Sequence, residues 1–124
     1  MKKILSHSLL IASAGLLIQQ IAVRAATPEV RTEEQVIRIL ASTFEFKPSE
    51  ITVKKGVPVI FELISMDRHH GFKLSKFDMR ADIKPGAVEK VRFVPDKTGT
   101  FTFFCDVFCG DGHEDMSGTL KVIE

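Results

Sequence analysis

The stretch "FFCDVFCGDGHEDM", from Phe103 to Met116, contains both cysteines of this 124-residue chain. Four side chains in it carry soft or borderline metal-binding atoms; they are Cys105, Cys109, His113 and Met116. Thiolate, imidazole and thioether groups gathered this closely indicate a metal site more than ordinary packing. The stretch therefore predicts a metal centre, and its spacing limits the structure that can surround it.

The stretch is unsuited to a helix. The four donors would share one helical face, because they are spaced by three or four residues. Across residues 105–116, however, a helix rising about 1.5 Å per residue would separate the first and last donors by roughly 16 Å. One centre with bonds of about 2 Å cannot use both ends. Gly110 and Gly112 also disfavour a helix, so we expect a loop that curls around the metal.

The donor types favour copper. Thiolates and a thioether select soft metals such as Cu(I), and imidazole also suits copper. A zinc site built from Cys105, Cys109, His113 and His70 is a chemically sensible alternative, but it would leave Met116 unused. A structural disulfide between the two cysteines is a second alternative. It would close a small ring and stabilise the fold little.

The chain after residue 34 has the pattern of an all-β domain. Segments rich in β-branched and aromatic residues predict strands at 35–40, 49–56, 57–65, 87–94, 99–105 and 118–123. Turn residues separate these segments, and no segment after residue 30 has a strong helical period; one turn is expected around 75–82. This pattern predicts an antiparallel sandwich or barrel. The aromatic side chains expected to fill its core are Phe61, Phe93, Phe101 and Phe103.

The first residues have the features of an export signal. Lys2 and Lys3 precede an apolar run, and small residues lie just before Ala26, so residues 1–25 are predicted to be a signal peptide cleaved after Ala25. An uncleaved membrane anchor is the alternative, because the run approaches the length that spans a bilayer. Residues 26–34 are expected to form a polar, flexible leader, and residues 35–124 are expected to form the copper-binding domain.

Charge and export limit the possible partners. Cleavage after Ala25 would leave 14 basic against 16 acidic side chains, a formal net charge of −2. This balance does not suggest nucleic-acid binding. Export would place the domain in the periplasm or another extracytoplasmic compartment, with membrane contact only if the leader is uncleaved.

A second element lies upstream of the cysteine stretch. The segment "DRHHGF", from Asp67 to Phe72, follows the apolar strand expected at 57–65 and places two histidines in a loop. If strand ends converge, His70 or His69 could lie over the cysteine loop. In an extended segment the two histidines point in opposite directions, so we expect His69 to be exposed or to lie outside the ligand set.

These two elements resemble a known family. The stretch "GTFTFFCDVFCGDGHEDMSGTLKV" matches the copper loop of the binuclear CuA-type domain of the cupredoxin family, found in cytochrome c oxidase subunit II and nitrous oxide reductase. The family pattern is Cys, three residues, Cys-Gly, two residues, His, two residues and Met, followed by a glycine-led strand. Asp67 and His70 match the family's Asp-two-residues-His pattern. The resemblance covers roughly residues 35–124 and implies a Greek-key cupredoxin-like β-sandwich or barrel.

The resemblance also implies a ligand set. In it, Cys105 and Cys109 bridge two copper ions, His70 binds one copper and His113 the other, and the side chain of Met116 and the carbonyl of Val107 are weak ligands. Valine is a departure, because this position is often acidic in the family. The family's aromatic cluster rich in Trp and Tyr is also missing, since the chain has neither residue.

The function implied is single-electron transfer with a transient redox partner such as a c-type cytochrome. The acidic residues of the loop could form a docking surface for a basic partner, with Phe108 at the surface over the site; they are Asp106, Asp111, Glu114 and Asp115. Two alternatives stay open: a copper chaperone or copper-handling protein, and a mononuclear cupredoxin in which Cys109 would be spare. No Ser-His-Asp set or carboxylate pair is evident, so we do not expect an enzyme.

Overall fold

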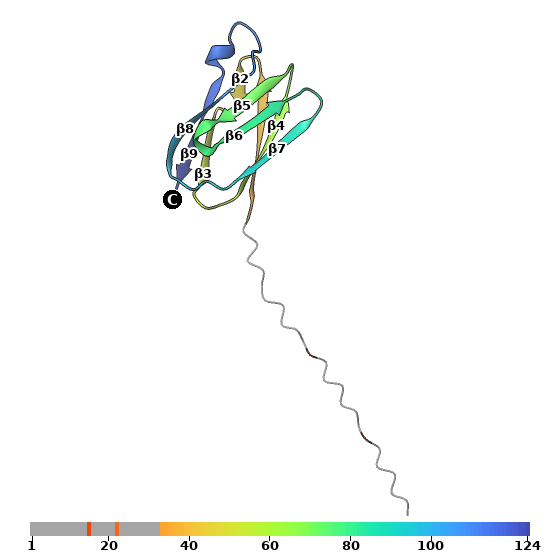
Figure 1. Ribbon diagram of the computed structural model, residues 1–124, viewed down its shortest axis with the longest axis vertical. Coiled ribbons are helices and arrows are strands. Elements are labelled where there is room, and N and C mark those ends of the chain that lie inside the picture. Colours follow the sequence, from red (N-terminus) through yellow and green to blue (C-terminus); the bar gives the residue numbers. More distant parts are fainter. Residues whose placement is uncertain (1–14, 16–21, 23–32) are drawn as a thin grey trace, which may run out of the picture.

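The computed structural model describes residues 15, 22 and 33–124, and residues 33–124 form two β-sheets packed face to face (Figure 1). The four-stranded sheet has the order β2 (Glu45–Lys47), β1 (Gln35–Ser42), β4 (Val59–Ser65) and β7 (Val88–Phe93). The five-stranded sheet has the order β3 (Glu50–Lys54), β9 (Ser117–Ile123), β8 (Gly99–Phe104), β5 (His70–Leu74) and β6 (Met79–Ile83). The expected all-β sandwich is confirmed.

The strand directions differ from the expectation. We expected an antiparallel sandwich, but β1 pairs with β4 in parallel, and β3 pairs with β9 in parallel. The chain leaves the first sheet after β2, crosses to the second sheet as β3 and returns as β4. Alternation of apolar and polar residues identifies a strand face but carries no information on the direction of its neighbour, so the sequence could not reveal the mixed pairing.

Three strands were not expected from the sequence. β2 has only three residues, and β5 is buried at four of its five positions, so neither shows a clear alternation. The single turn expected around 75–82 is correct only in its first half. A short 3-10 turn, η1, covers Ser75–Phe77, and β6 follows it. The sequence of β6, "MRADI", contains few residues that favour strands, and its pairing with β5 holds it extended.

The core between the sheets is built on phenylalanine. β4 alternates strictly, so that Phe61 and Leu63 point inward and are fully buried. Phe72 of β5 lies at the centre of an aromatic cluster, with ring centroids 5.9 Å from Phe46, 5.6 Å from Phe61 and 5.0 Å from Phe103. Of the four phenylalanines expected in the core, Phe61 and Phe103 are fully buried, and Phe93 and Phe101 are partly buried against it.

The topology brings the cysteine loop and His70 to one end of the sandwich. β5 and β9 both run antiparallel to β8, so the start of β5, the end of β8 and the start of β9 lie together. The backbone N–H of Cys105 donates to the carbonyl of Met116 at 3.0 Å and closes the loop at its base. The sheet pairing therefore brings both predicted elements of the site together.

The predicted signal peptide 1–25 and leader 26–34 lie almost wholly outside the described residues. Within the part of the chain that the structure describes, no helix has both the length and the apolar character needed to span a bilayer.

Phe72→Ala tests the aromatic core. Removing the central ring of the cluster leaves a cavity between the sheets, and we expect it to lower the free energy of unfolding by about 3–5 kcal/mol. Urea unfolding of the metal-free protein measures this change. Ile123→Ala, at a position with 38% exposure, is the control and should cost far less. Equal costs for the two variants would contradict the packing described.

Candidate metal centre

Three of the predicted donors form a buried cluster at the loop end of the sandwich. The nearest ligand atoms of His70, Cys105 and Cys109 all lie within 4.8 Å of one another. His70 is fully buried, and both cysteines are 3% exposed. The two Sγ atoms are 3.9 Å apart, well beyond the length of about 2 Å of a disulfide bond. Both cysteines are free thiols in this structure, so the disulfide alternative is not the arrangement observed.

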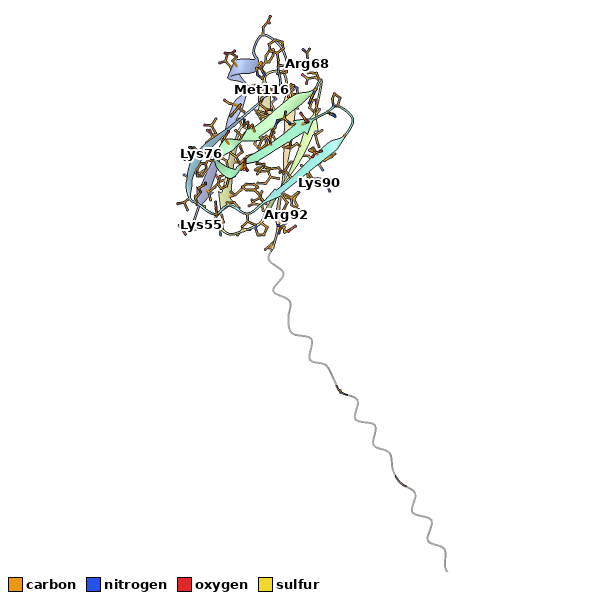
Figure 2. All side chains as sticks on the ribbon, viewed as in Figure 1. Lys55, Arg68, Lys76, Lys90, Arg92 and Met116 are labelled. Atoms are coloured by element: carbon orange, nitrogen blue, oxygen red, sulfur yellow. The ribbon has the colours of Figure 1, made fainter. Side chains whose placement is uncertain are left out.

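The remaining predicted donors lie around the same two sulfur atoms. His113 Nδ1 is 3.6 Å and Met116 Sδ is 3.8 Å from Cys109 Sγ. The carbonyl oxygen of Val107 is 3.1 Å from Cys105 Sγ. The structure therefore brings together all six residues that the sequence comparison suggested. In Figure 2, Met116 and Arg68 are both labelled in the upper part of the domain.

The loop reaches this geometry without a helix, as expected. Residues 105–112 are irregular, and a short 3-10 turn, η2, covers His113–Asp115 and delivers the buried Met116 to the start of β9. Phe108 is 75% exposed, and its ring lies 5.8 Å from the ring of His113. It lies at the surface over the half-buried His113, where the sequence suggested it would be.

The ring of His70 is held in one orientation. Its Nε2 lies 2.6 Å from Asp67 Oδ1, and since an ionised carboxylate only accepts hydrogen bonds, this nitrogen carries the proton. The other nitrogen, Nδ1, is buried and has no hydrogen-bond partner among the described residues. A buried ring nitrogen without a hydrogen-bond partner, beside two sulfur atoms, has the form of a metal ligand whose ring is oriented by a carboxylate.

Asp67 is held as an anion by several donors. The backbone N–H and the hydroxyl of Thr43 donate to its Oδ2 at 2.7 and 2.8 Å, and the backbone N–H of Arg68 donates to its Oδ1 at 2.7 Å. Burial alone would raise the pKa of Asp67, but the hydrogen bonds from His70, Thr43 and Arg68 outweigh it and hold the pKa well below its usual range. The carboxylate therefore stays an acceptor for His70 at neutral pH.

The two sulfur atoms lie in a dry environment. Burial raises the pKa of the Cys109 thiol from 9.0 to about 11, and the nearby Cys105 adds to the rise. Two backbone contacts fix the pair: the N–H of Gly71 donates to Cys105 Sγ at 3.3 Å, and Arg68 Nη1 donates to the Cys109 carbonyl at 3.0 Å. A metal cation would therefore have to replace a proton on a buried thiol, which couples metal binding to proton release.

A network of charged side chains flanks the loop on its β6 side. Arg80 Nε donates to Asp106 Oδ2 at 2.7 Å, and Arg80 Nη2 donates to Asp82 Oδ1 at 3.0 Å. His69 Nε2 lies 3.0 Å from the same Asp82 oxygen, and hydrogen bonds from Arg80 and His69 lower the pKa of Asp82 to about 2. As expected, His69 is exposed and lies outside the cluster of donors.

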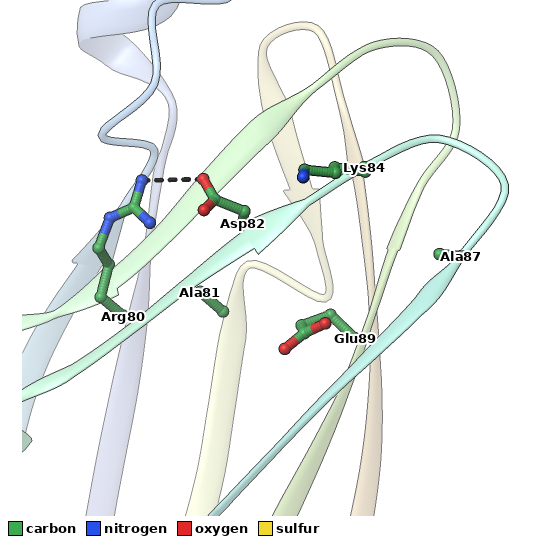
Figure 3. A pocket seen from close by; sticks show the side chains of 6 residues that line it. All are labelled: Arg80, Ala81, Asp82, Lys84, Ala87 and Glu89. Carbon is green, nitrogen blue, oxygen red and sulfur yellow. Dashed lines mark hydrogen bonds and ion pairs between the residues drawn. The ribbon is translucent and has the colours of Figure 1, made fainter.

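A shallow groove lies beside this network. Its lining side chains come from β6, from the turn that follows β6, and from β7 (Figure 3). The Arg80–Asp82 ion pair lies at one end of the groove. None of the six candidate ligands lines the groove. Among the described residues, the groove is therefore separate from the cluster of candidate ligands.

Sequence reasoning missed the residues that support the donors. Thr43 lies 24 residues from Asp67, and Arg68 lies 41 residues from Cys109, so no local pattern connects either pair. Gly71 directly follows His70 in the sequence. Its backbone N–H reaches Cys105 Sγ only because β5 pairs with β8. These contacts are consequences of the tertiary fold.

The raised pKa of Cys109 predicts how the metal-free protein responds to alkali. Because the folded state holds this proton more tightly than the unfolded state, the associated stability is complete below pH 9 and is lost as the pH rises through about 11. One pKa unit corresponds to about 1.4 kcal/mol, so we expect a loss on the order of 2 kcal/mol. Urea unfolding of the native chain and of Cys109→Ala at pH 8 and pH 10.5 measures it. An equal decline in both would refute this assignment.

Comparison with known proteins agrees with this geometry. The family described as Cupredoxin-like domain matches residues 9–122. The chain is similar to cytochrome c oxidase subunit 2 of Thermus thermophilus, with 30% identity over 99 residues that cover 80% of this chain and 73% of the relative. It is also similar to nitrous-oxide reductase of Ralstonia nicotianae, with 30% identity over 98 residues that cover 75% of this chain but only 15% of the relative.

A solved structure supports the fold independently. The periplasmic domain of subunit II of cytochrome oxidase from Bradyrhizobium japonicum superimposes with a TM-score of 0.68 at 21% identity, covering 73% of this chain and 84% of the other. Since the family match spans nearly all of the described domain and the sandwich is shared, this chain belongs to the cupredoxin-like domain family.

Proposed function

We propose that this protein transfers single electrons through a binuclear copper centre bridged by the sulfur atoms of Cys105 and Cys109. The observation that carries the proposal is the position of the two free, buried sulfurs, 3.9 Å apart, with the unpartnered Nδ1 of His70 close by. The similarity to cytochrome c oxidase subunit 2 and nitrous-oxide reductase supports the same conclusion.

The residues present fit copper. Two thiols, two imidazoles and a thioether form a donor set that copper prefers, and the thioether of Met116 is not used by typical zinc sites. In the proposed arrangement Cys105 and Cys109 bridge two ions, His70 and His113 each bind one ion, and Met116 and the Val107 carbonyl are weak ligands. Such a set leaves no open position for a substrate, which favours an electron carrier over an enzyme.

The chain's own residues would make electron transfer fast by keeping the site rigid. Bound copper would supply a one-electron couple. The hydrogen bond that His70 donates to Asp67 fixes the imidazole ring, and the hydrogen bond that Arg68 donates to the Cys109 carbonyl fixes the backbone there, so the donors need to move little. The core rings of Phe72 and Phe103 exclude water from beneath the site, and a dry environment of this kind helps to tune the potential of a metal centre.

Copper delivery is the second candidate function. The observation that favours it is the exposure of this end of the molecule, because His113 is only half-buried and a partner could reach a metal bound there. The same ligands would serve, with an exchangeable ion. A mononuclear cupredoxin has weaker support, because Cys109 Sγ lies within 4 Å of the donor atoms of Cys105, His113 and Met116 and is therefore central to the cluster.

The metal content and the electron paramagnetic resonance (EPR) spectrum of the copper-loaded protein test the proposal. We expect two coppers per chain and a hyperfine pattern of one electron shared by two equivalent nuclei. In Cys109→Ser the bridge is lost, so the pattern should change to the four lines of one copper. A four-line spectrum with one copper per native chain would contradict the binuclear proposal.

Chelator challenge then separates carrier from delivery protein. A resident redox centre should lose its copper slowly, because the cysteine ligands are buried and held by the closed loop. Complete transfer of copper to a chelator within the time of mixing would contradict the carrier function and favour delivery.

We further propose an exported location and a basic redox partner such as a c-type cytochrome. The exposed carboxylates of Asp111, Glu114 and Asp115 surround the loop, and Phe108 offers an exposed apolar contact beside His113. Asp106, by contrast, is paired with Arg80, so it contributes less to this surface than the sequence suggested.

Ionic strength tests this partner. Charge attraction should make the second-order rate of electron transfer from a basic c-type cytochrome fall as salt rises, since screening shortens the reach of the carboxylates. The triple variant Asp111→Asn, Glu114→Gln, Asp115→Asn should weaken this dependence, and Glu89→Gln on β7 is the control. A rate that is independent of salt in the native protein would refute an electrostatic partner surface.

A further inference from the structure

The turn between β1 and β2 touches both halves of the metal centre. It consists of Thr43 and Phe44, which the sequence comparison did not connect with copper. We propose that this turn is a positioning element that fixes the His70 ring and the course of the ligand loop together. This inference rests on the proposed copper site and adds two residues to it that are not ligands.

Thr43 acts on the histidine side. Its backbone N–H and its hydroxyl both donate to Asp67 Oδ2, while Asp67 Oδ1 accepts from His70. A carboxylate anchored at one oxygen only could rotate about its terminal bond and carry the histidine with it. Because Thr43 holds the second oxygen through two hydrogen bonds, the carboxylate has one orientation, and the His70 Nδ1 lone pair is directed accordingly.

Phe44 acts on the loop side. Its ring lies directly against the backbone of two glycines of the ligand loop. A Cβ atom built on Gly110 would be 2.9 Å from two carbons of the ring, and a Cβ atom on Gly112 would be 2.6 Å from its Cγ. Contacts this short do not occur between real side chains, so the loop follows the face of the ring as closely as a backbone can.

Gly112 gives the more informative of these two contacts. Gly110 has a φ of 136°, which already requires glycine, whereas Gly112 has φ −101° and ψ 9°, which other residues adopt. At position 112 it is therefore the ring of Phe44, which supplies the three atoms nearest to a Cβ atom built there, and not the backbone conformation, that excludes a side chain. Cγ is bonded to the Cβ of Phe44, so the ring cannot avoid the clash by moving its tip and would have to swing away as a whole.

The contacts of Thr43 and Phe44 connect the two sides of the site through adjacent residues of one turn. One residue of the turn fixes the carboxylate behind His70, and the next supports the loop segment between Cys109 and His113. Phe44 is 39% exposed and adds little to the core, so its close fit to the loop is better explained by positioning than by burial. Displacement of the turn should loosen both sides of the site at once.

A double-mutant cycle between Gly112→Ala and Phe44→Ala tests the loop contact. The rates measured are labelling of the two thiols by a thiol reagent in the metal-free protein and removal of copper by a chelator in the loaded protein. In the native background Gly112→Ala should raise both rates about tenfold, within the range of coupling between contacting residues. With Phe44→Ala present, the same substitution should raise them little, because the clash is gone.

The cycle has a clear contrary outcome. If Gly112→Ala raises the rates by the same factor with and without the Phe44 ring, the ring does not position the loop and the inference is wrong. Phe77→Ala, a half-buried aromatic at the opposite end of β5, is the matched control for loss of a ring. It should leave thiol labelling and copper removal close to native, and thermal unfolding of each variant corrects for global destabilisation.

Thr43→Val and Thr43→Ser test the histidine side. Valine keeps the shape of threonine but loses the hydroxyl donor, whereas serine keeps the donor. We expect Thr43→Val to shift the reduction potential and the hyperfine splitting of the copper-loaded protein, and Thr43→Ser to restore native values. Native values in Thr43→Val, or identical shifts in both variants, would overturn the role of Thr43.

These tests separate failure of the inference from failure of the copper proposal. If the native protein binds no copper, the proposed function fails, but thiol labelling of the metal-free variants still reports on the Phe44 contact. If the native protein binds copper and the cycle is additive, the inference alone fails.

Discussion

Two buried sulfur atoms held 3.9 Å apart are the constraint on which the rest of this structure depends. Thiols gain nothing from lying side by side in a dry environment, where burial, and to a lesser extent the neighbouring Cys105, raises the pKa of Cys109 and disfavours its anion. The fold keeps them together by pairing β8 with β9 in antiparallel fashion and closing the intervening loop with a hydrogen bond from Cys105 to Met116. The arrangement becomes favourable when a cation lies between the sulfurs.

The other half of the site is supplied by a different part of the sandwich. β5 begins at His70 and enters the core through the fully buried Phe72, so the histidine is anchored by the same aromatic cluster that holds the sheets together. Its ring is then oriented by Asp67. Polar contacts from outside the core, from the 43–44 turn and from Arg68, fix the carboxylate and the loop relative to each other. Packing thus determines where the site lies in the fold, and hydrogen bonds determine the orientation of the His70 ring and of the loop.

Much of this architecture could be predicted from the sequence, for physical reasons that differ between elements. The loop at Cys105–Met116 was predictable because the reach of one metal centre excludes a helix, and the spacing of its donors matches a specific family pattern. The β-sandwich followed from short segments rich in β-branched and aromatic residues, such as the one that forms β4, separated by turn residues. The parallel pairs β1–β4 and β3–β9 were not predictable, since the pattern of apolar and polar residues in a strand does not depend on the direction of the neighbouring strand. Nor was β5, which is too buried to alternate.

The supporting contacts were out of reach of sequence reasoning for another reason. Thr43, Phe44 and Arg68 meet the site only through the tertiary fold, and an exposed phenylalanine in a turn is usually a surface residue. Within the acidic loop, the sequence does not distinguish Asp106 from its acidic neighbours, whereas in the structure Asp106 is paired with Arg80 of β6. Residues that bind a metal follow a local pattern, but residues that position those ligands follow the shape of the whole domain.

X-ray absorption at the copper edge tests the central claim most directly, because it measures the neighbours of each metal ion. The account predicts sulfur and nitrogen neighbours together with a short copper–copper contact in the loaded native protein. It also predicts loss of that contact in Cys109→Ser. A spectrum of the native protein with sulfur and nitrogen neighbours but no copper–copper contact would contradict a centre bridged by two cysteines.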